Sequence, residues 1–421
     1  MRTFFSAVLV MLVCASFSSP SAFCATPDAN PFFAPYGTPF ETPPFYRIRP
    51  EHYMPAYQKA MEEQKREIQI ITMVRSAPTF ENTIVALDRS GELLQRVSGV
   101  FGVLRGAITN DQLDSIATIV TPLLTAHRND IALNAQLFAR IRAVYDMRSK
   151  LSLTPEQAML LDNTYKDFVR GGANLSEPDK QRLRNINDEL SMLSLKFNQN
   201  LLKETNTYRM VVEKKEDLDG LPQNVIDAAA EAARKATLDG KWVFTLQKPS
   251  WIPFLQYAKN RALRETLYKA YCNRGDNNNA FDNKAISSRI AALRVARANL
   301  LGYPTHAAYV LEENMAKTPA TVYEFLNRLW EPALKVAQQE GIFVRVDMED
   351  STCTTDTIDV FTTLFKEFPR MGIVLQAYLR RTEQDARDLL PAGAGFRLCK
   401  GIYKEPADIA FQDRGEVQRN F

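Results

Sequence analysis

The stretch EPALKVAQQEGIFVRVD, residues Glu331–Asp347, decides how this chain is divided. Up to Glu340 its side chains continue a helical pattern. Gly341 then opens IFVRVD, whose β-branched and aromatic residues are typical of a strand. No linker separates the two patterns. We therefore expect a mostly α-helical region before Glu340–Gly341 and a region of alternating strands and helices after it.

The composition agrees with a folded protein of more than one domain. The chain has 421 residues, enough for two or three domains with sizeable cores. Hydrophobic residues make up 45% of the chain and charged residues 24%, as in ordinary soluble domains. The net charge of +3 and the lack of any lysine or arginine block argue against a nucleic-acid partner.

The first 25 residues are predicted to be a signal peptide. Arg2 provides the positive charge, and the apolar run from Phe4 to Phe17 has the length of a secretory signal core. Small residues precede a cleavage site near Cys24–Ala25. An uncleaved anchor and a lipoprotein signal are the alternatives, but the run is short for a membrane span. We expect a periplasmic or secreted protein with no stable span after cleavage.

Residues 26–340 carry strong helix signals. Thr154-Pro-Glu-Gln157 has the form of a capping box with proline at the first helical position, and Ser176-Glu-Pro-Asp179 places a carboxylate in a first turn. The apolar residues that follow Ser176 repeat every three or four positions and predict one long helix. They are Leu183, Ile186, Leu190, Leu193, Phe197 and Leu201. Similar periodicity predicts helices over Ile84–Leu94, Leu113–Leu124 and Ala285–Leu300, and 208–212 and 242–246 predict a small hairpin.

Several short sequence motifs in this region resemble those of one protein family. They are Pro50-Glu-His52, Pro78-Thr-Phe-Glu-Asn-Thr-Ile84, Phe168-Val-Arg-Gly-Gly-Ala173, Leu218-Asp-Gly-Leu-Pro222, Leu263-Arg-Glu-Thr-Leu-Tyr268, Ala298-Asn-Leu-Leu-Gly-Tyr303 and Asn314-Met-Ala-Lys-Thr-Pro319. Together they resemble the M3 metallopeptidases, in particular the dipeptidyl carboxypeptidase and oligopeptidase branch. That resemblance implies a nearly all-helical body with a deep channel for short peptides. It also implies zinc, held by His-Glu-x-x-His and a downstream glutamate.

The zinc motif of that family is absent from these 421 residues. The histidines His52, His127 and His306 are isolated, and none has a Glu-x-x-His context. We therefore predict no metal ligands, although the family is expected to use zinc, and no peptidase activity from this chain. A helical protein that binds peptides without cleaving them is the alternative.

The last part of the chain, residues 341–421, has a β/α pattern. Strands are predicted at 342–347, 372–378 and 396–400, with helices at 355–368 and 382–390 between them, the second capped by Thr382. Strand and helix alternating at this spacing predict a parallel sheet or part of a (β/α)₈ barrel. The fold class expected for the whole chain is thus mostly α, followed by a partial barrel.

Polar residues gather at the ends of those three strands, where barrel enzymes place their sites. They are Asp347, Gln376, Tyr378, Arg397 and Lys400. The words around them resemble proline dehydrogenase: Phe343-Val-Arg-Val-Asp-Met-Glu-Asp-Ser351, Gly372-Ile-Val-Leu-Gln-Ala-Tyr-Leu-Arg-Arg381 and Arg397-Leu-Cys-Lys-Gly-Ile-Tyr-Lys-Glu-Pro406.

The second resemblance implies an FAD enzyme that oxidises L-proline and passes electrons to quinone, in the cytoplasm or at a membrane surface. Asp347 and Arg397 match its catalytic pair. Its flavin contacts match Met348, Gln376, Lys400, Gly401 and Ile402, although Ile402 stands where the family usually has a small residue. Three β/α units cannot close a barrel, and their edge strands stay unpaired. We therefore interpret the chain as a chimera in which neither active site is complete.

Overall fold

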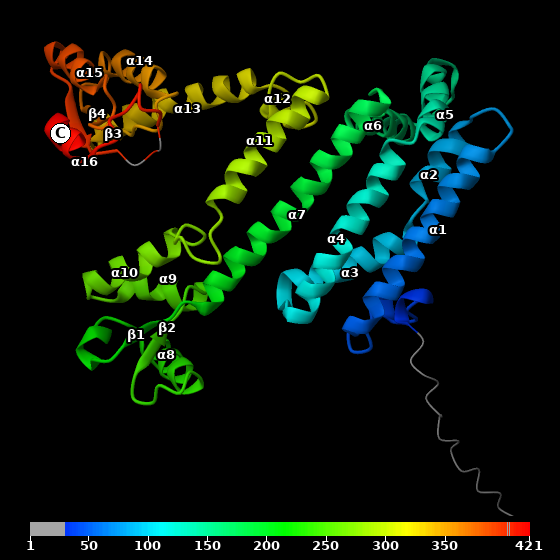
Figure 1. The fold of residues 1–421 in the computed structure, drawn as a ribbon, viewed down its shortest axis with the longest axis horizontal. Helices are drawn as coiled ribbons and strands as arrows, with labels where there is room; N and C mark the ends of the chain where they lie inside the picture. Colours follow the sequence, from blue (N-terminus) through cyan, green and yellow to red (C-terminus); the bar gives the residue numbers. More distant parts are fainter. Residues whose placement is uncertain (1–29, 402, 404) are drawn as a thin grey trace, which may run out of the picture. The chain divides into compact units, whose positions relative to one another are not determined.

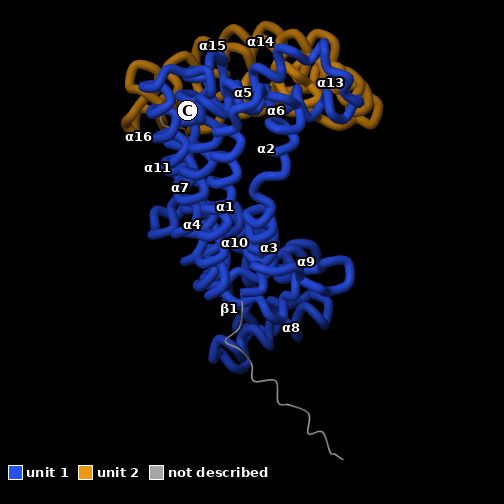
Figure 2. Tube along the Cα trace, turned by 90° about the vertical axis from the view of Figure 1, so that its right-hand side faces the viewer, with its two compact units in different colours: residues 1–306 blue, residues 307–421 orange. Residues whose placement is uncertain are grey.

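The computed structural model describes residues 30–401, 403 and 405–421. The expected signal peptide and Ile402 lie outside the described residues. The chain separates into two compact units, residues 1–306 and 307–421, which are coloured separately in Figure 2. No helix among the described residues combines the length and the apolar character needed to cross a membrane.

The described part of the first half of unit 1, residues 30–207, contains helices and no strand (Figure 1). Its elements are the short helices η1 (Pro31–Phe33), η2 (Pro39–Glu41) and η3 (Pro50–His52), then α1 (Tyr53–Met73), η4 (Phe80–Val85), α2 (Ala86–Asp88), α3 (Glu92–Ile108), α4 (Asp111–Ala132), α5 (Ala135–Asp146), η5 (Arg148–Lys150), α6 (Pro155–Arg170) and α7 (Glu177–Thr207). One apolar core joins α1, α3 and α4 around Tyr53, Tyr57 and Phe101. A second joins the end of α1 to η4, α5 and α6 around Ile141 and Phe168.

Helix α7 confirms the long helix predicted after Ser176. Ser176 caps it by accepting a hydrogen bond from the Asp179 N–H, and the predicted capping box at Thr154 forms at the start of α6. Leu183 and Leu190 are buried, as the apolar stripe predicted. Helix α7 packs against α4 on one side and α11 on the other, so it links the two halves of unit 1.

The predicted helix over Ile84–Leu94 is not continuous. Residues up to Val85 form the wide π turn η4, and Gly91 adopts φ of 77° before α3 begins. This left-handed backbone ends one helix and re-aims the chain, and glycine adopts it without the strain a side chain brings. An added Cβ at Gly91 would also overlap the side chain of Gln64. Apolar periodicity alone did not reveal this break.

The second half of unit 1 surrounds a two-stranded hairpin. Its elements are β1 (Met210–Val212), η6 (Lys215–Leu218), α8 (Gln223–Lys235), β2 (Trp242–Phe244), α9 (Lys248–Tyr257), α10 (Arg261–Cys272) and α11 (Lys284–Leu300). The strands pair antiparallel, with Met210 opposite Phe244, which confirms the predicted hairpin. Phe244 packs edge-to-face on the fully buried Phe254 at a centroid distance of 4.5 Å.

Unit 2 begins within α12 (His306–Leu311) and is built on a three-stranded parallel sheet. Its other elements are α13 (Pro319–Gln339), β3 (Val344–Val346), α14 (Thr354–Phe365), β4 (Met371–Gln376), α15 (Thr382–Leu389), η7 (Leu390–Ala392), β5 (Gly395–Cys399) and α16 (Arg414–Asn420). The strand order β3-β4-β5 follows the chain, and the predicted alternation of strand and helix is confirmed. All six residues of β4 are buried, whereas β3 and β5 are half-exposed edge strands.

Two details of unit 2 differ from the sequence prediction. Thr382 does not cap α15, because its hydroxyl donates to the Gln376 carbonyl oxygen at 2.6 Å. In addition, Leu334 of α13 is buried in the same core as Phe361 and Ile373. Helix α13 therefore packs with the sheet, and Glu340–Gly341 lies inside unit 2 rather than at its border.

Candidate functional site

The parallel strands of unit 2 bring predicted polar residues together at or near the carboxyl ends of the strands, called the strand edge below. Asp347 directly follows β3, and Arg397 lies in β5 with its Nη2 4.0 Å from Asp347 Oδ1. The two side chains are 73% and 57% exposed, so water screens their attraction. An exposed pair at this distance contributes roughly 0–1 kcal/mol to stability. The structure thus brings the predicted pair together without locking it.

Gln376 occupies the centre of this edge and is buried. Its Nε2 donates to the Met348 carbonyl oxygen at 3.1 Å, while its Oε1 has no hydrogen-bond partner among the described residues. A buried amide oxygen without a donor carries a desolvation cost of roughly 1–3 kcal/mol. Met348 is 4% exposed and its side chain belongs to the apolar core of unit 2. The unsatisfied Gln376 Oε1 is therefore an acceptor that a ligand could use.

Gly401 has a reason to be glycine that the sequence did not reveal. Its φ is 96°, and a Cβ built there would overlap the ring of Tyr378. The close approach predicted for a cofactor at Gly401 is thus made by an aromatic side chain of the protein. Lys400 points elsewhere, with its Nζ 5.6 Å from the ring centroid of Phe421.

Glu405 was not singled out from the sequence but anchors the loop that follows β5. Its carboxylate accepts hydrogen bonds from the Ser351 N–H at 2.8 Å and the Ser351 hydroxyl at 2.7 Å. Burial, followed by the charges of Glu405 and Asp350, raises the pKa of Tyr378 to about 12. The Tyr378 phenol therefore stays protonated at neutral pH. The Glu-Pro dipeptide after Lys404 was the only sequence signal for this anchor.

The three histidines of the helical body have separate surroundings. His52 is buried and its Nδ1 accepts from the Arg49 N–H at 3.1 Å. His127 places its Nε2 2.7 Å from Gln64 Oε1, and burial followed by the charge of Lys65 lowers its pKa. Burial and then the charges of Arg294 and Arg297 lower the pKa of His306. Among the described residues no group of His, Cys, Asp and Glu side chains could hold a metal ion.

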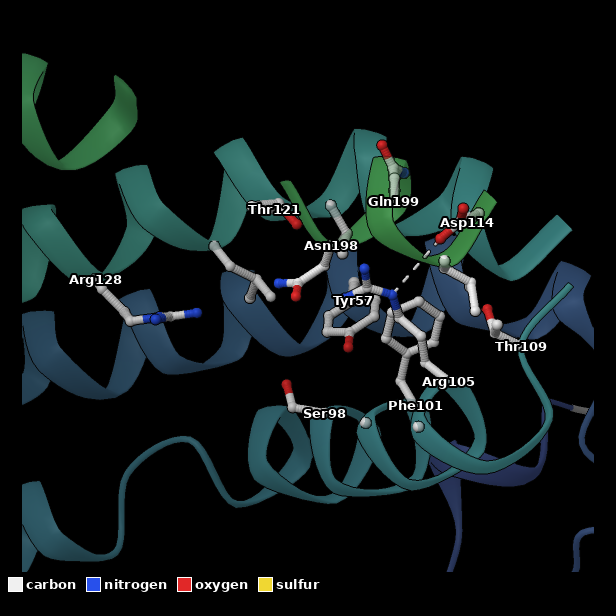
Figure 3. A pocket seen from close by; sticks show the side chains of 15 residues that line it. Tyr57, Ser98, Phe101, Arg105, Thr109, Asp114, Thr121, Arg128, Asn198 and Gln199 are labelled. Atoms are coloured by element: carbon white, nitrogen blue, oxygen red, sulfur yellow. Dashed lines mark ion pairs between the residues drawn. The ribbon is translucent and has the colours of Figure 1, made fainter. Parts of the chain in front are cut away.

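A pocket of about 460 Å³ opens within unit 1, between α1, α3, α4 and α7 (Figure 3). Tyr57 forms its inner wall, and Arg105 and Arg128 enter it from opposite sides of that ring. Asp114 is the one carboxylate in the described lining and lies 3.9 Å from Arg105. Sequence periodicity did not reveal this pocket, because its lining residues come from four helices.

Comparison with known proteins finds similarity to one family. Residues 254–350 match the profile described as Peptidase family M3. The match starts in α9 and extends past Glu340 to Asp350. The chain is thus similar to M3 peptidases, as the sequence words indicated.

Individual relatives extend this similarity over most of the chain. Dipeptidyl carboxypeptidase of Escherichia coli is 38% identical over 311 residues, which cover 74% of this chain and 46% of that protein. Oligopeptidase A of Haemophilus influenzae is 31% identical over 302 residues, covering 71% and 44%. Oligopeptidase A of E. coli is 30% identical over 310 residues, covering 73% and 45%. The chain spans about half the length of these curated relatives.

Proposed function

We propose that the helical body derives from an M3-type zinc oligopeptidase or peptidyl-dipeptidase and binds short peptides. The observation that carries the proposal is the 38% identity to a dipeptidyl carboxypeptidase over 311 residues. The helical architecture of unit 1 is consistent with that origin, because the predicted caps, long helix and hairpin all form.

We further propose that this chain binds peptides without hydrolysing them. Zinc peptidases of this kind need two histidines one helical turn apart and a glutamate that activates water. The 421 residues contain no such motif. In the part of the chain that the structure describes, none of His52, His127 and His306 belongs to a group of His, Cys, Asp and Glu side chains that could hold a metal ion.

Binding can be measured by fluorescence anisotropy with labelled peptides of four to eight residues. The proposal predicts saturable binding of the labelled peptide and its displacement by an unlabelled peptide. The peptide recovered afterwards should be uncleaved. Absence of displaceable binding at concentrations up to about 1 mM, where the binding free energy falls to about −4 kcal/mol, would rule it out.

A second function, FAD-dependent oxidation of L-proline with quinone as acceptor, is proposed for residues 341–421. It rests on the strand-edge geometry and the proline dehydrogenase-like words, and on none of the relatives named above. Bound FAD would supply the hydride acceptor. Gln376 Oε1 would accept a hydrogen bond from the ligand, and the Arg397 guanidinium would supply positive charge beside it. We propose that this site is incomplete, so that binding is weak and proline is not oxidised.

Titration of the purified full chain with FAD, followed by flavin fluorescence, tests this second function. We expect weak binding that the Gln376→Leu variant abolishes and the Gln384→Leu variant on exposed α15 retains. Flavin that co-purifies in stoichiometric amount and bleaches with L-proline would overturn the view that the site is incomplete. Equal FAD affinity in both variants would show that Gln376 does not contact the bound FAD.

The two functions belong to different compartments, since the predicted signal peptide directs the chain out of the cytoplasm and proline oxidation feeds a membrane quinone pool. We therefore propose that the chain is a fusion joined near Glu340–Gly341, a position inside unit 2 and ten residues before the end of the M3 profile match. A single long sequencing read of the source DNA across codons 300 to 380 tests the join. One uninterrupted molecule carrying both parts supports it, and separation of the two parts refutes it.

A further inference from the structure

The pocket between α1, α3, α4 and α7 is lined by both apolar and cationic side chains. Phe101, Val120, Leu124 and Leu202 supply apolar lining, and the rim residue Leu202 is exposed. The volume of about 460 Å³ falls within the range of small-molecule sites. Apolar and cationic side chains together suit a ligand with an apolar body and a polar head.

The charged side chains of the lining are two arginines and one aspartate, so positive charge exceeds negative charge. Arg105 is paired loosely with Asp114 at 3.9 Å, and both are partly exposed. Arg128 makes no hydrogen bond or ion pair with any other described residue. Arg128 thus has no ion-pair partner among the described residues, and its guanidinium can pair with an anion that enters the pocket.

Tyr57 lines the same pocket as the two arginines, and its hydroxyl lies on the side of Ser98. Its side chain is only 1% exposed. Burial raises the pKa of Tyr57, while a hydrogen bond with Ser98 and the charges of Arg128 and Arg105 oppose that rise. Both guanidiniums thus act on the same phenol oxygen. Tyr57, Ser98 and the two arginines offer mainly donors, which is the complement of an oxyanion.

Two glycines of α3 leave part of the pocket wall without side chains. Gly102 and Gly106 line the pocket, and a Cβ added to either would meet no atom within 4 Å. Glycine inside a helix costs about 1 kcal/mol relative to alanine. The chain carries that cost twice on the wall of one cavity.

We propose that this pocket binds a small carboxylate with an apolar body, whose head pairs with Arg128 and whose tail packs on apolar lining residues such as Leu124 and Phe101. A free branched-chain acid and the C-terminal residue of a peptide share this chemistry. The site does not depend on the proposed peptidase lineage and is separate from the strand edge of unit 2.

Isothermal titration of the full chain in a carboxylate-free buffer tests the proposal with N-acetylleucine, N-acetylleucinamide and 4-methylpentanoate. We expect the acetylated acid to bind at least about tenfold more tightly than its amide, a difference of about 1.4 kcal/mol. Tighter binding of N-acetylleucine than of 4-methylpentanoate identifies a peptide C-terminus, and the reverse identifies a free acid. Equal binding of acid and amide, or no binding of either acid up to about 10 mM, overturns the proposal.

Matched variants place the ligand in the pocket. Arg128→Gln should weaken acid binding about tenfold, whereas Arg66→Gln, at an exposed arginine of α1 outside the pocket, should not. Gly102→Leu should fill the cavity and abolish binding, while Gly99→Leu on the same helix, outside the lining, should retain it. Circular dichroism checks that each variant is folded. Equal affinities across either pair would place the ligand elsewhere.

Discussion

The helical body and the β/α unit bury their apolar residues in different ways. The described part of unit 1 has three separate cores, built around Tyr57, Ile141 and Phe254. Helix α7 contacts α4 and α11. Unit 2 depends mainly on one core, in which the buried strand β4 lies between two half-exposed edge strands. Loss of one side chain in unit 1 should therefore weaken one core and leave the other two intact, whereas in unit 2 it weakens the main core of the whole unit.

The largest effect is expected from removing a central aromatic ring. Phe361→Ala in unit 2 and Phe254→Ala in unit 1 each delete a side chain that is fully buried. Each should cost about 3–5 kcal/mol, since a cavity remains where the ring was. Urea unfolding followed by hydrogen exchange should show Phe361→Ala exposing the amides of β4 while those of α7 stay protected. Loss of protection throughout the chain in both variants would show that the units do not unfold separately.

The next effect concerns the tight packing at the edge of the sheet. Gly401→Ala forces a Cβ into the Tyr378 ring at φ of 96°, and we expect a loss of about 2–4 kcal/mol from strain and overpacking. Gly393→Ala is the control, because its φ is 74° but a Cβ there meets nothing. Its expected cost is about 1–2 kcal/mol. Thermal unfolding compares the two, and equal losses would contradict the contact with Tyr378.

A smaller effect tests a polar contact within the helical body. The Glu204 carboxylate accepts from Asn277 Nδ2 and Asn279 Nδ2, both at 2.7 Å, and from the Gly275 N–H. Burial opposes its ionisation, but these hydrogen bonds prevail and leave the Glu204 pKa below its usual 4.5. Because the folded-state pKa is the lower one, the stabilisation is complete above pH 4.5 and fades as the pH falls through the folded-state value.

Glu204→Gln should therefore cost about 1–3 kcal/mol at pH 7, and the difference from the unsubstituted chain should narrow below pH 4.5. Urea unfolding at pH 7 and pH 3.5 measures both values. Glu216→Gln, at a solvent-exposed site, serves as the control. A difference that grows in acid would show that the carboxylate is destabilised rather than stabilised by its surroundings.

The smallest effect is expected at the strand edge. Removing the exposed Asp347–Arg397 pair by Arg397→Ala should change the free energy of unfolding by less than about 0.5 kcal/mol. A double-mutant cycle with Asp347→Asn measures the coupling. A coupling free energy above about 1 kcal/mol would show that the ion pair stabilises unit 2 and would contradict the view that its side chains are available to a ligand.

Sequence patterns predicted those parts of the fold that depend on local signals. The caps at Thr154 and Ser176, the α7 stripe and the three strands of unit 2 all form, because neighbouring residues specify them. The break at Gly91 and the packing of Leu334 against Phe361 depend on contacts with distant residues. Apolar periodicity shows that a face is buried but not which element covers it.

The candidate sites were predictable to different degrees. The strand-edge residues were found because parallel strands bring their carboxyl ends to one side of a sheet. Among them, however, Gly401 packs on Tyr378 and Lys400 on Phe421, which no motif could show. The pocket of Arg105 and Arg128 was missed, since its residues share no short motif.

The most direct test of the central claim is hydrolysis of a fluorogenic short peptide by the purified full chain with added zinc. The account predicts no zinc-dependent turnover, while the same preparation binds the intact peptide. E. coli dipeptidyl carboxypeptidase serves as the positive control. Turnover that co-elutes with the chain, disappears on chelation and returns with zinc would contradict the claim that this helical body binds peptides without cleaving them.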